Sequence, residues 1–149
     1  MLRCATKNFG VLEYEAGAVL TFPRGLPGFE TETLFVPIEQ EASKPALFLQ
    51  SLVTAKLCFI ALPMETIDPA YQLKVSDEDL RVIGASSGTS ESLRCLAVVC
   101  AGRGRPTANL LGPIVINRDT RKAVQAVRDD GLYAVEHPLL AESEAEECW

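Results

Sequence analysis

The sequence contains very little of the chemistry that metal sites and acid-base catalysis need. His137 is its only histidine, and none of its five cysteines forms a C-x-x-C pair with another. Two-histidine metal sites and zinc ribbons are therefore excluded within one chain, and the odd number of cysteines argues against a disulfide framework. We expect free thiols and no metal or other cofactor. Cys58, Cys95 and Cys100 lie in apolar runs, where a thiol behaves as a small hydrophobe, whereas Cys148 should be accessible.

Long apolar runs and clusters of positive charge are also missing. No stretch approaches the 18 or so apolar residues of a membrane-spanning helix, and the N-terminus lacks the apolar stretch of a signal peptide, so we expect a cytoplasmic protein. The formal net charge is -6, but four acidic residues lie within the last eight positions, which leaves only about -2 on the rest of the chain. Without a Lys/Arg run, little counterion release is available, so direct binding to nucleic acid is not expected.

The length and composition fit one domain with a short appendage. A chain of 149 residues with 48% hydrophobic content can bury a core without disulfides or metals. We expect this domain to comprise residues 1–140. Residues 141–149 form an acidic tail that has little apolar surface to bury, and we expect it to be disordered.

Short β-rich segments separated by turn residues recur through nearly the whole chain. Most of them show partial rather than clean period-2 alternation. The pattern predicts an all-β, mainly antiparallel fold, and specifically a small β-barrel-like domain. The predicted strands cover residues 2–6, 11–14, 18–22, 34–38, 47–52, 57–62, 71–75, 92–101, 114–117, 123–127 and 132–136.

One short helix is predicted over residues 77–83. Ser76 is suited to cap its start, and Asp79 is a capping-box partner among acidic residues that favour the positive end of a helix. Gly84 is suited to end it in the left-handed conformation. Two turns are too few for an independent helix, so this one must pack on the sheet.

Two predicted strands are apolar on both faces. They cover residues 57–62 and the stretch 96–101. An antiparallel sheet usually exposes one face to water, so such a strand is either central and covered or presents apolar surface to a partner. The sequence leaves both alternatives open.

A G-x-S-x-G string around Ser86 raises the remote alternative of a small serine hydrolase. The nucleophile elbow of that class needs a strand before the serine and a helix after it. Here a predicted helix precedes Ser86 and a predicted strand follows, so we interpret the string as a connecting loop. No base, nucleophile and oxyanion donors can be assembled from the remaining residues, and we expect no enzymatic activity.

Three blocks of sequence, in order and with consistent spacing, span residues 2 to about 140. The first contains Thr6-x-x-Phe9-Gly10 and Phe22-Pro23-Arg24-Gly25-Leu26-Pro27-Gly28-Phe29-Glu30. The second contains Leu49-Gln50-Ser51-Leu52, the strand 57–62 and Pro69-x-Tyr71. The third runs from Thr107 to Asn117 and continues with Gln125, Tyr133 and His137-Pro138-Leu139. Together these blocks resemble the flagellar assembly factor FliW family.

The resemblance implies a non-enzymatic protein with two protein partners. Members of the family bind flagellin when it accumulates in the cytoplasm, and when free of flagellin they bind CsrA and relieve its repression of flagellin translation. We therefore expect flagellin and CsrA as partners and a monomer when free. The alternatives are a chaperone of flagellin alone, without CsrA antagonism, and a β-barrel adaptor of an unrelated pathway.

The same blocks supply the residues that we expect to contact a partner. Gly25 is equally suited to a purely backbone role, and the asparagines to satisfying loop backbone groups. One residue of the Phe59-Ile60 pair must face the core, and the sequence does not say which. The expected contact residues are Pro23, Gly25, Leu26, Pro27, Phe29, Gln50, Phe59, Asn109, Leu110 and Asn117.

Overall fold

The structure is a computed structural model that describes residues 1–101 and 104–139. The predicted tail 141–149, with Cys148, lies outside the described residues. Within them, no helix is long and apolar enough to cross a membrane.

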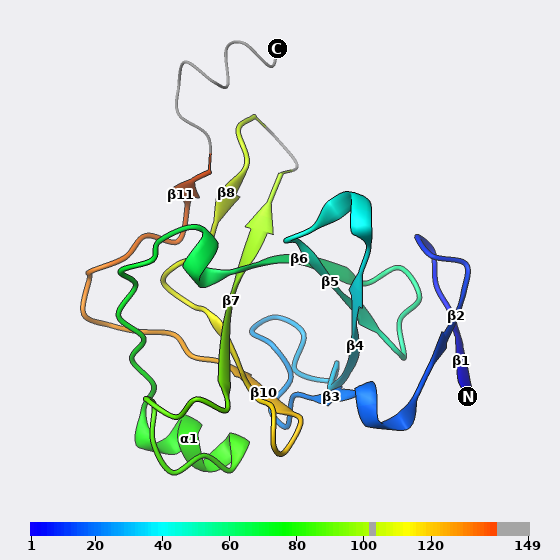
Figure 1. Cartoon of the computed structure of the whole chain (residues 1–149), viewed down its shortest axis with the longest axis horizontal. Coiled ribbons are helices and arrows are strands. Elements are labelled where there is room, and N and C mark those ends of the chain that lie inside the picture. The colour runs from blue at the N-terminus through cyan, green and yellow to red at the C-terminus, as the bar shows by residue number, and fades with distance from the viewer. Residues whose placement is uncertain (102–103, 140–149) are drawn as a thin grey trace.

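Seven strands close into a barrel, which confirms the predicted all-β fold (Figure 1). Neighbours run in the order β7-β6-β5-β4-β3-β10-β9, and β9 pairs back onto β7 to close the circle. These pairings are antiparallel except that of β10 with β3, which is parallel. The barrel strands are β3 (Leu20–Thr21), β4 (Leu34–Glu39), β5 (Leu47–Ser51), β6 (Cys58–Pro63), β7 (Leu93–Cys100), β9 (Ile114–Asn117) and β10 (Lys122–Gln125).

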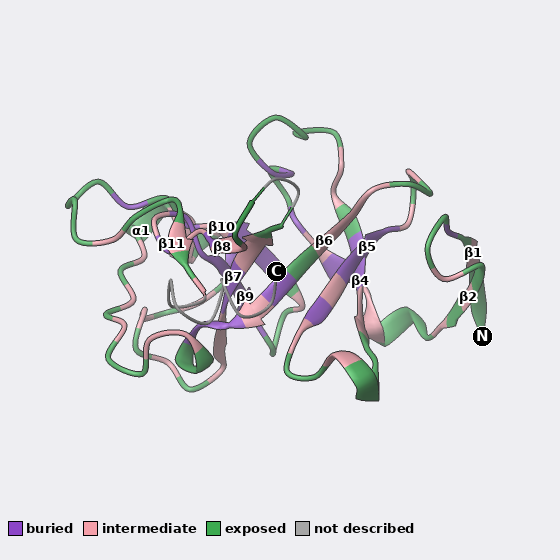
Figure 2. Ribbon diagram, turned by 90° about the horizontal axis from the view of Figure 1, so that it is seen from above, coloured by how far each residue is buried: buried purple, intermediate pink, exposed green. Residues whose placement is uncertain are grey.

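Four further strands lie outside this ring. β8 (Thr107–Ala108) pairs with the end of β7, and β11 (His137–Pro138) pairs with β8. β1 (Leu2–Ala5) and β2 (Val11–Tyr14) form a separate hairpin, which Figures 1 and 2 both show beside β4 and β5. The loop of this hairpin docks on the barrel because Phe9 packs edge-on against Phe48 at 5.3 Å.

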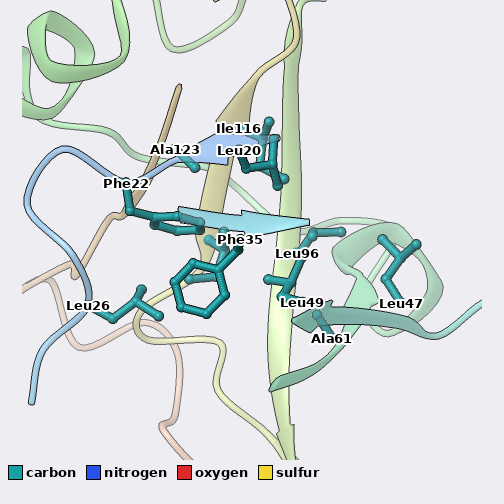
Figure 3. Close-up of a cluster of buried hydrophobic side chains, with 11 residues drawn as sticks. Leu20, Phe22, Leu26, Phe35, Leu47, Leu49, Ala61, Leu96, Ile116 and Ala123 are labelled. Atoms are coloured by element: carbon teal, nitrogen blue, oxygen red, sulfur yellow. The ribbon is translucent and has the colours of Figure 1, made fainter. Parts of the chain in front are cut away.

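The barrel interior holds the main core (Figure 3). Residues that alternate along the strands point inward and pack together, as expected for a small barrel whose interior is filled by side chains. Phe59 shares this inner side with its cross-strand partner Leu49, while Ile60 faces outward and is partly exposed. The core comprises Leu20, Phe22, Leu26, Phe35, Leu47, Leu49, Ala61, Leu96, Ile114, Ile116 and Ala123.

The middle of strand β7 is covered on both faces, which explains the apolar residues on both of its faces there. Leu96 packs in the barrel interior, whereas Ala97 belongs to a second cluster on the outer face with Met64 and Leu110. Two segments cover this face: the one after β6, whose Tyr71 packs against the cluster, and the one before β11, whose Tyr133 does the same. The structure shows the central and covered alternative for Leu96 and Ala97, whereas the stretch 96–101 ends exposed at Cys100 and Ala101.

The predicted helix is confirmed residue for residue. α1 covers Asp77–Ile83, the Ser76 hydroxyl accepts a hydrogen bond from the Asp79 amide at 3.1 Å, and Gly84 ends the helix with φ 70°. Ile83 is fully buried in a third cluster that joins the helix to the outer faces of β9 and β10. The two-turn helix is thus held by the sheet, as its length requires.

Several strand predictions are wrong. Residues 71–75 and 132–136 join no ladder, the second segment is bent, and β3 is shorter than the predicted 18–22. In the first segment, polar groups bond to distant partners instead: Tyr71 donates its hydroxyl to the Leu110 carbonyl at 2.7 Å. The two-residue strands β8 and β11 had no sequence signal, and neither did the short 3₁₀ turns η1 (Ala16–Ala18), η2 (Glu41–Ser43) and η3 (Met64–Thr66).

Candidate functional site

The sequence Leu26-Pro27-Gly28-Phe29 forms a tight turn at one end of the barrel. Leu26 and Phe29 exchange backbone hydrogen bonds of 3.3 and 2.7 Å, and Gly28 has φ 85°. Proline followed by a glycine with positive φ is the signature of a type II turn. The turn therefore sends Leu26 into the core and leaves Phe29 at the surface.

A row of four phenylalanines leads from the barrel interior to this turn. Phe22 packs edge-on against Phe35 at 5.3 Å, Phe35 lies 5.9 Å from Phe59, and Phe59 packs edge-on against Phe29 at 5.6 Å. Figure 3 shows the inner pair, Phe22 and Phe35, side by side. Exposure rises along the row, from none at Phe22 to 42% at Phe29. The row thus ends in an aromatic ring that is fixed by packing but open to solvent.

Beside Phe29 lies a pocket of about 300 Å³, which we call the mouth pocket. The turn residues Leu26 and Pro27 form one wall, and β6 contributes Phe59. The carboxyl ends of β7 and β10, the start of β9, β8 with the residue after it, and the segment before β11 contribute the rest. The remaining lining residues are Val98, Cys100, Thr107, Asn109, Ile114, Gln125, Val135 and Glu136.

Two side-chain amides hold the loop before β9 and leave polar atoms on the pocket rim. Asn109 accepts a hydrogen bond from the Gly112 amide at 2.8 Å, and Gln125 donates one to the Gly112 carbonyl at 2.9 Å. Among the described residues, Asn109 Nδ2 and Gln125 Oε1 make no hydrogen bond. The pocket therefore combines apolar walls with a spare donor and a spare acceptor, the usual make-up of a binding site.

An ion pair fixes the turn to the helix. Arg24 lies 3.2 Å from both Glu78 and Asp79 at the start of α1. Gly25, next to it, has φ 64°, and a β-carbon there would lie only 2.5 Å from the Glu30 carbonyl oxygen. The backbone of the turn is thus held from two sides, which positions Phe29 before any partner arrives.

The structure brings five of the ten expected contact residues together in the mouth pocket: Leu26, Pro27, Phe29, Phe59 and Asn109. Their role as partner contacts stays a prediction. Pro23 is exposed but lies outside the pocket. The remaining four, Gly25, Gln50, Leu110 and Asn117, are buried, so they do not reach a partner while this fold is intact.

Two of the buried residues have clear structural roles. Gln50 lies on the outer side of β5 under the β1–β2 hairpin loop, and its amide donates to the carbonyls of Ser51 and Ala55 at 3.0 and 3.1 Å. Asn117 donates to the Ile83 carbonyl at the end of α1 at 2.9 Å and accepts from the Asp119 amide at 3.0 Å. These residues satisfy buried backbone groups, as loop asparagines often do.

Sequence reasoning missed the pocket residues from β7, β8, β9, β10 and the segment before β11. Val98 lies in the doubly apolar stretch 96–101, for which contact with a partner is one of the two alternatives, Ile114 lies in a predicted strand, and Val135 lies in a predicted strand that does not form. No local signal shows that these residues meet, because only the closure of the barrel brings them together. The sequence hints at their role only through the third resemblance block, which contains Ile114 and Gln125.

The four described cysteines are free, and their exposure differs from expectation in one case. Burial raises the pKa of the Cys58 thiol, and burial followed by the nearby Glu65 raises that of Cys95 to about 12. Both are therefore poor nucleophiles at neutral pH. Cys100, expected to be a buried small hydrophobe, is exposed at the end of β7 on the pocket wall.

The described residues show no cluster of metal-ligating side chains, and Ser86 does not have the context of a nucleophile elbow. They contain no group of three or more His, Cys, Asp or Glu side chains placed to hold a metal ion. Ser86 lies in a loop between α1 and β7, so a helix precedes it and a strand follows. This order is the reverse of the strand-serine-helix elbow.

Comparisons of sequence and of structure with known proteins all match the same family. The model of the FliW protein family matches residues 3–139. The flagellar assembly factor FliW of Heliobacterium modesticaldum is 33% identical over 147 residues, which cover 99% of this chain and 96% of that protein. Its counterpart in Syntrophomonas wolfei is 30% identical over 146 residues, covering 98% and 94%. A crystal structure of the flagellar assembly factor FliW superposes with a TM-score of 0.84 at 30% identity, covering 94% of this chain and 98% of that one.

Proposed function

Because the chain belongs to the FliW family of flagellar assembly factors, we propose that it binds flagellin and, when free of flagellin, binds and antagonises the translational regulator CsrA. Through this exchange of partners it controls flagellin synthesis in the cytoplasm. It acts by protein contacts alone, without a cofactor, and is a monomer when free. A chaperone of flagellin without CsrA antagonism is the alternative.

The observation that carries this proposal is the mouth pocket with Phe29 at its edge. A cavity of about 150 Å³ is enough to hold benzene, so a pocket of about 300 Å³ admits a large apolar side chain of a partner. Aromatic residues that are held in place by packing are typical hot spots of protein interfaces. The free polar atoms of Asn109 and Gln125 can then bond the partner's backbone beside the inserted side chain.

Charge supports the choice of partners. The net charge of -6 makes long-range attraction to a basic RNA-binding regulator favourable, although such steering raises the rate of association more than the affinity. If flagellin and CsrA both bind in the mouth pocket, only one of them can be bound at a time. If they use separate sites, a coupling of about 1 to 3 kcal/mol changes each affinity roughly 5- to 150-fold.

The first experiment tests the pocket with matched variants. Phe29→Ala removes the exposed ring, while Val11→Ala removes an apolar side chain that is 68% exposed on the β1–β2 hairpin, away from the pocket. We expect Phe29→Ala to weaken binding of flagellin, measured by calorimetry, by at least about 10-fold, which is about 1.4 kcal/mol. Val11→Ala should bind as the wild type does. Equal binding by all three proteins would show that the pocket is not the contact.

The second experiment tests the exchange of partners. Flagellin is titrated into a preformed complex of this protein with labelled CsrA, and the release of CsrA is followed by fluorescence anisotropy. We expect flagellin to displace CsrA, and raised salt to slow the association of CsrA. If CsrA stays bound at saturating flagellin, the exchange mechanism is wrong. If flagellin binds and CsrA never does, the protein is a flagellin chaperone only.

A further inference from the structure

A second, smaller pocket opens at the other end of the barrel. The mouth pocket lies by the carboxyl ends of β7 and β10, whereas this one lies by their amino ends, next to the start of β5. Its volume is about 160 Å³. Core residues form its floor, and three arginines reach it from β7 and from the turn between β9 and β10. We call it the arginine pocket; its lining comprises Arg94, Arg118 and Arg121 over Leu20, Leu47, Leu96 and Ile116, with Pro37 at the side.

Carboxylates scarcely neutralise these three charges. No acidic residue lines the pocket. The Glu39 carboxylate, itself half exposed, lies 4.0 Å from Arg94, at the outer limit of an ion pair. Within residues 1–101 and 104–139, Arg118 forms no ion pair. Three positive charges that line one small pocket over an apolar floor repel one another. Such a cluster in a chain with a net charge of -6 is a local feature rather than a property of the whole surface.

Arg121 adds a second, independent observation. Among the described residues it is the only non-glycine with a positive φ, 59°, a conformation that disfavours side chains larger than that of glycine. Its Nη2 donates to the Ala18 carbonyl at 2.7 Å, which fixes the guanidinium at the pocket wall. Its Nε is shielded from solvent and has no hydrogen-bond partner among the described residues. A buried donor without a partner is uncommon in proteins and is one of the features that accompany a site for a bound water or ion.

We propose that the arginine pocket binds a carboxylate carried on a short apolar stem. Guanidinium groups present paired N–H donors that match the two oxygens of a carboxylate, and Arg121 is already anchored for that contact. The leucine and isoleucine floor takes the stem, which the volume of about 160 Å³ limits to a few carbon atoms. The carboxylate offsets the repulsion among the three arginines. The ligand is either a free short-chain carboxylate or the C-terminal residue of a peptide chain with an apolar side chain.

The test uses the full chain and two probes of this chemistry. Isocaproate represents the free acid, and a tetrapeptide of three glycines and a C-terminal leucine represents the chain end. Binding is followed by the shifts of backbone amide signals in NMR spectra, with sodium chloride added to keep the ionic strength constant. We expect saturable shifts at the amino ends of β5, β7 and β10. Saturation by isocaproate but not by the peptide identifies the free acid as the source, and tighter binding of the peptide identifies the chain end.

Charge variants and neutral probes decide the outcome. Arg118→Gln, at an exposed position, should weaken binding of the better probe at least 5-fold, and Arg94→Gln should do the same if the first variant folds poorly. Arg81→Gln, an exposed arginine of α1, serves as the control and should leave binding unchanged. Isocaproamide and the amidated peptide should not bind. Binding of the amides as tight as that of the acids, unchanged affinity in both pocket variants, or no saturable binding of either acid would overturn the proposal.

Discussion

The guanidinium of Arg128 holds the carboxylate of Asp130 at two points, with Nε 3.0 Å from Oδ1 and Nη2 2.7 Å from Oδ2. The Arg128 side chain is only 2% exposed, and it lies 5.4 and 4.6 Å from the ring centres of Tyr71 and Tyr133. Its Nη1 also donates to the Gln72 carbonyl. This cluster ties together the two segments, after β6 and before β11, that cover the outer face of β7. In the sequence, the stretch Arg128-Asp129-Asp130-Gly131 resembles an ordinary charged turn.

This contact predicts a pH-dependent stability. Hydrogen bonds from Arg128 lower the pKa of Asp130 from 3.8 to about 2, so the carboxylate stabilises the folded state fully above the unfolded pKa of about 4. Its contribution is lost as the pH falls from about 4 towards 2. We therefore expect Asp130→Asn to melt below the wild type at neutral pH, and the difference to shrink in that acid range. Calorimetric melts at several pH values measure it.

Asp129→Asn is the matched control for this prediction. Asp129 is 97% exposed and lies 3.9 Å from Lys74, so its removal should change the melting temperature little at any pH. A difference between Asp130→Asn and the wild type that stays constant down to pH 2 would contradict the role given to the Arg128 contact.

The cap of α1 gives a second prediction. Ser76→Ala removes the hydroxyl that accepts from the Asp79 amide, and we expect the free energy of unfolding to fall by about 1 kcal/mol. Urea denaturation measures the change. Ser86→Ala is the control, because this exposed hydroxyl makes no hydrogen bond among the described residues and the variant should unfold as the wild type does. If the wild type hydrolysed esters faster than background and Ser86→Ala abolished this activity, the hydrolase alternative would be supported.

Asn117 tests whether a residue of the resemblance blocks serves the fold or a partner. Asn117→Ala leaves the Ile83 carbonyl and the Asp119 amide without this partner, which should destabilise the protein by about 1 to 3 kcal/mol. Asn8→Ala, at an exposed position in the hairpin loop, should have no such effect. Unchanged stability of Asn117→Ala together with weaker flagellin binding would assign Asn117 to the interface instead.

Removal of residues 141–149 should leave the domain stable. This segment lies outside the described residues, and apart from Trp149 it offers almost nothing apolar to bury. Thermal melts of the shortened chain and of the full chain are expected to agree within error. A large fall in the melting temperature would show that Trp149 packs on the domain and that the boundary near residue 140 is misplaced.

Elements whose signals are local were predictable from the sequence. The helix α1 was predicted with both ends, because a serine cap and a glycine stop act within one turn of the helix. The Leu26–Phe29 turn was predictable for the same reason. The segments 71–75 and 132–136 misled, because an extended, β-rich stretch becomes a strand only if a neighbouring strand offers it a ladder. Here Tyr71 and the Ala134 carbonyl bond instead to the loop before β9.

The all-β class, the one short helix and the resemblance to the FliW family were already evident in the amino-acid sequence, because turn chemistry, strand-forming residues and motif spacing are properties of short stretches of chain. Tertiary structure alone decided the closure of the barrel between β7 and β9, the inward direction of Phe59 and the burial of Gln50, Leu110 and Asn117. It also assembled both pockets from residues far apart in the chain, between positions 26 and 136 in one case and 20 and 121 in the other. Such contacts depend on the register and closure of the whole sheet, and no local pattern encodes them.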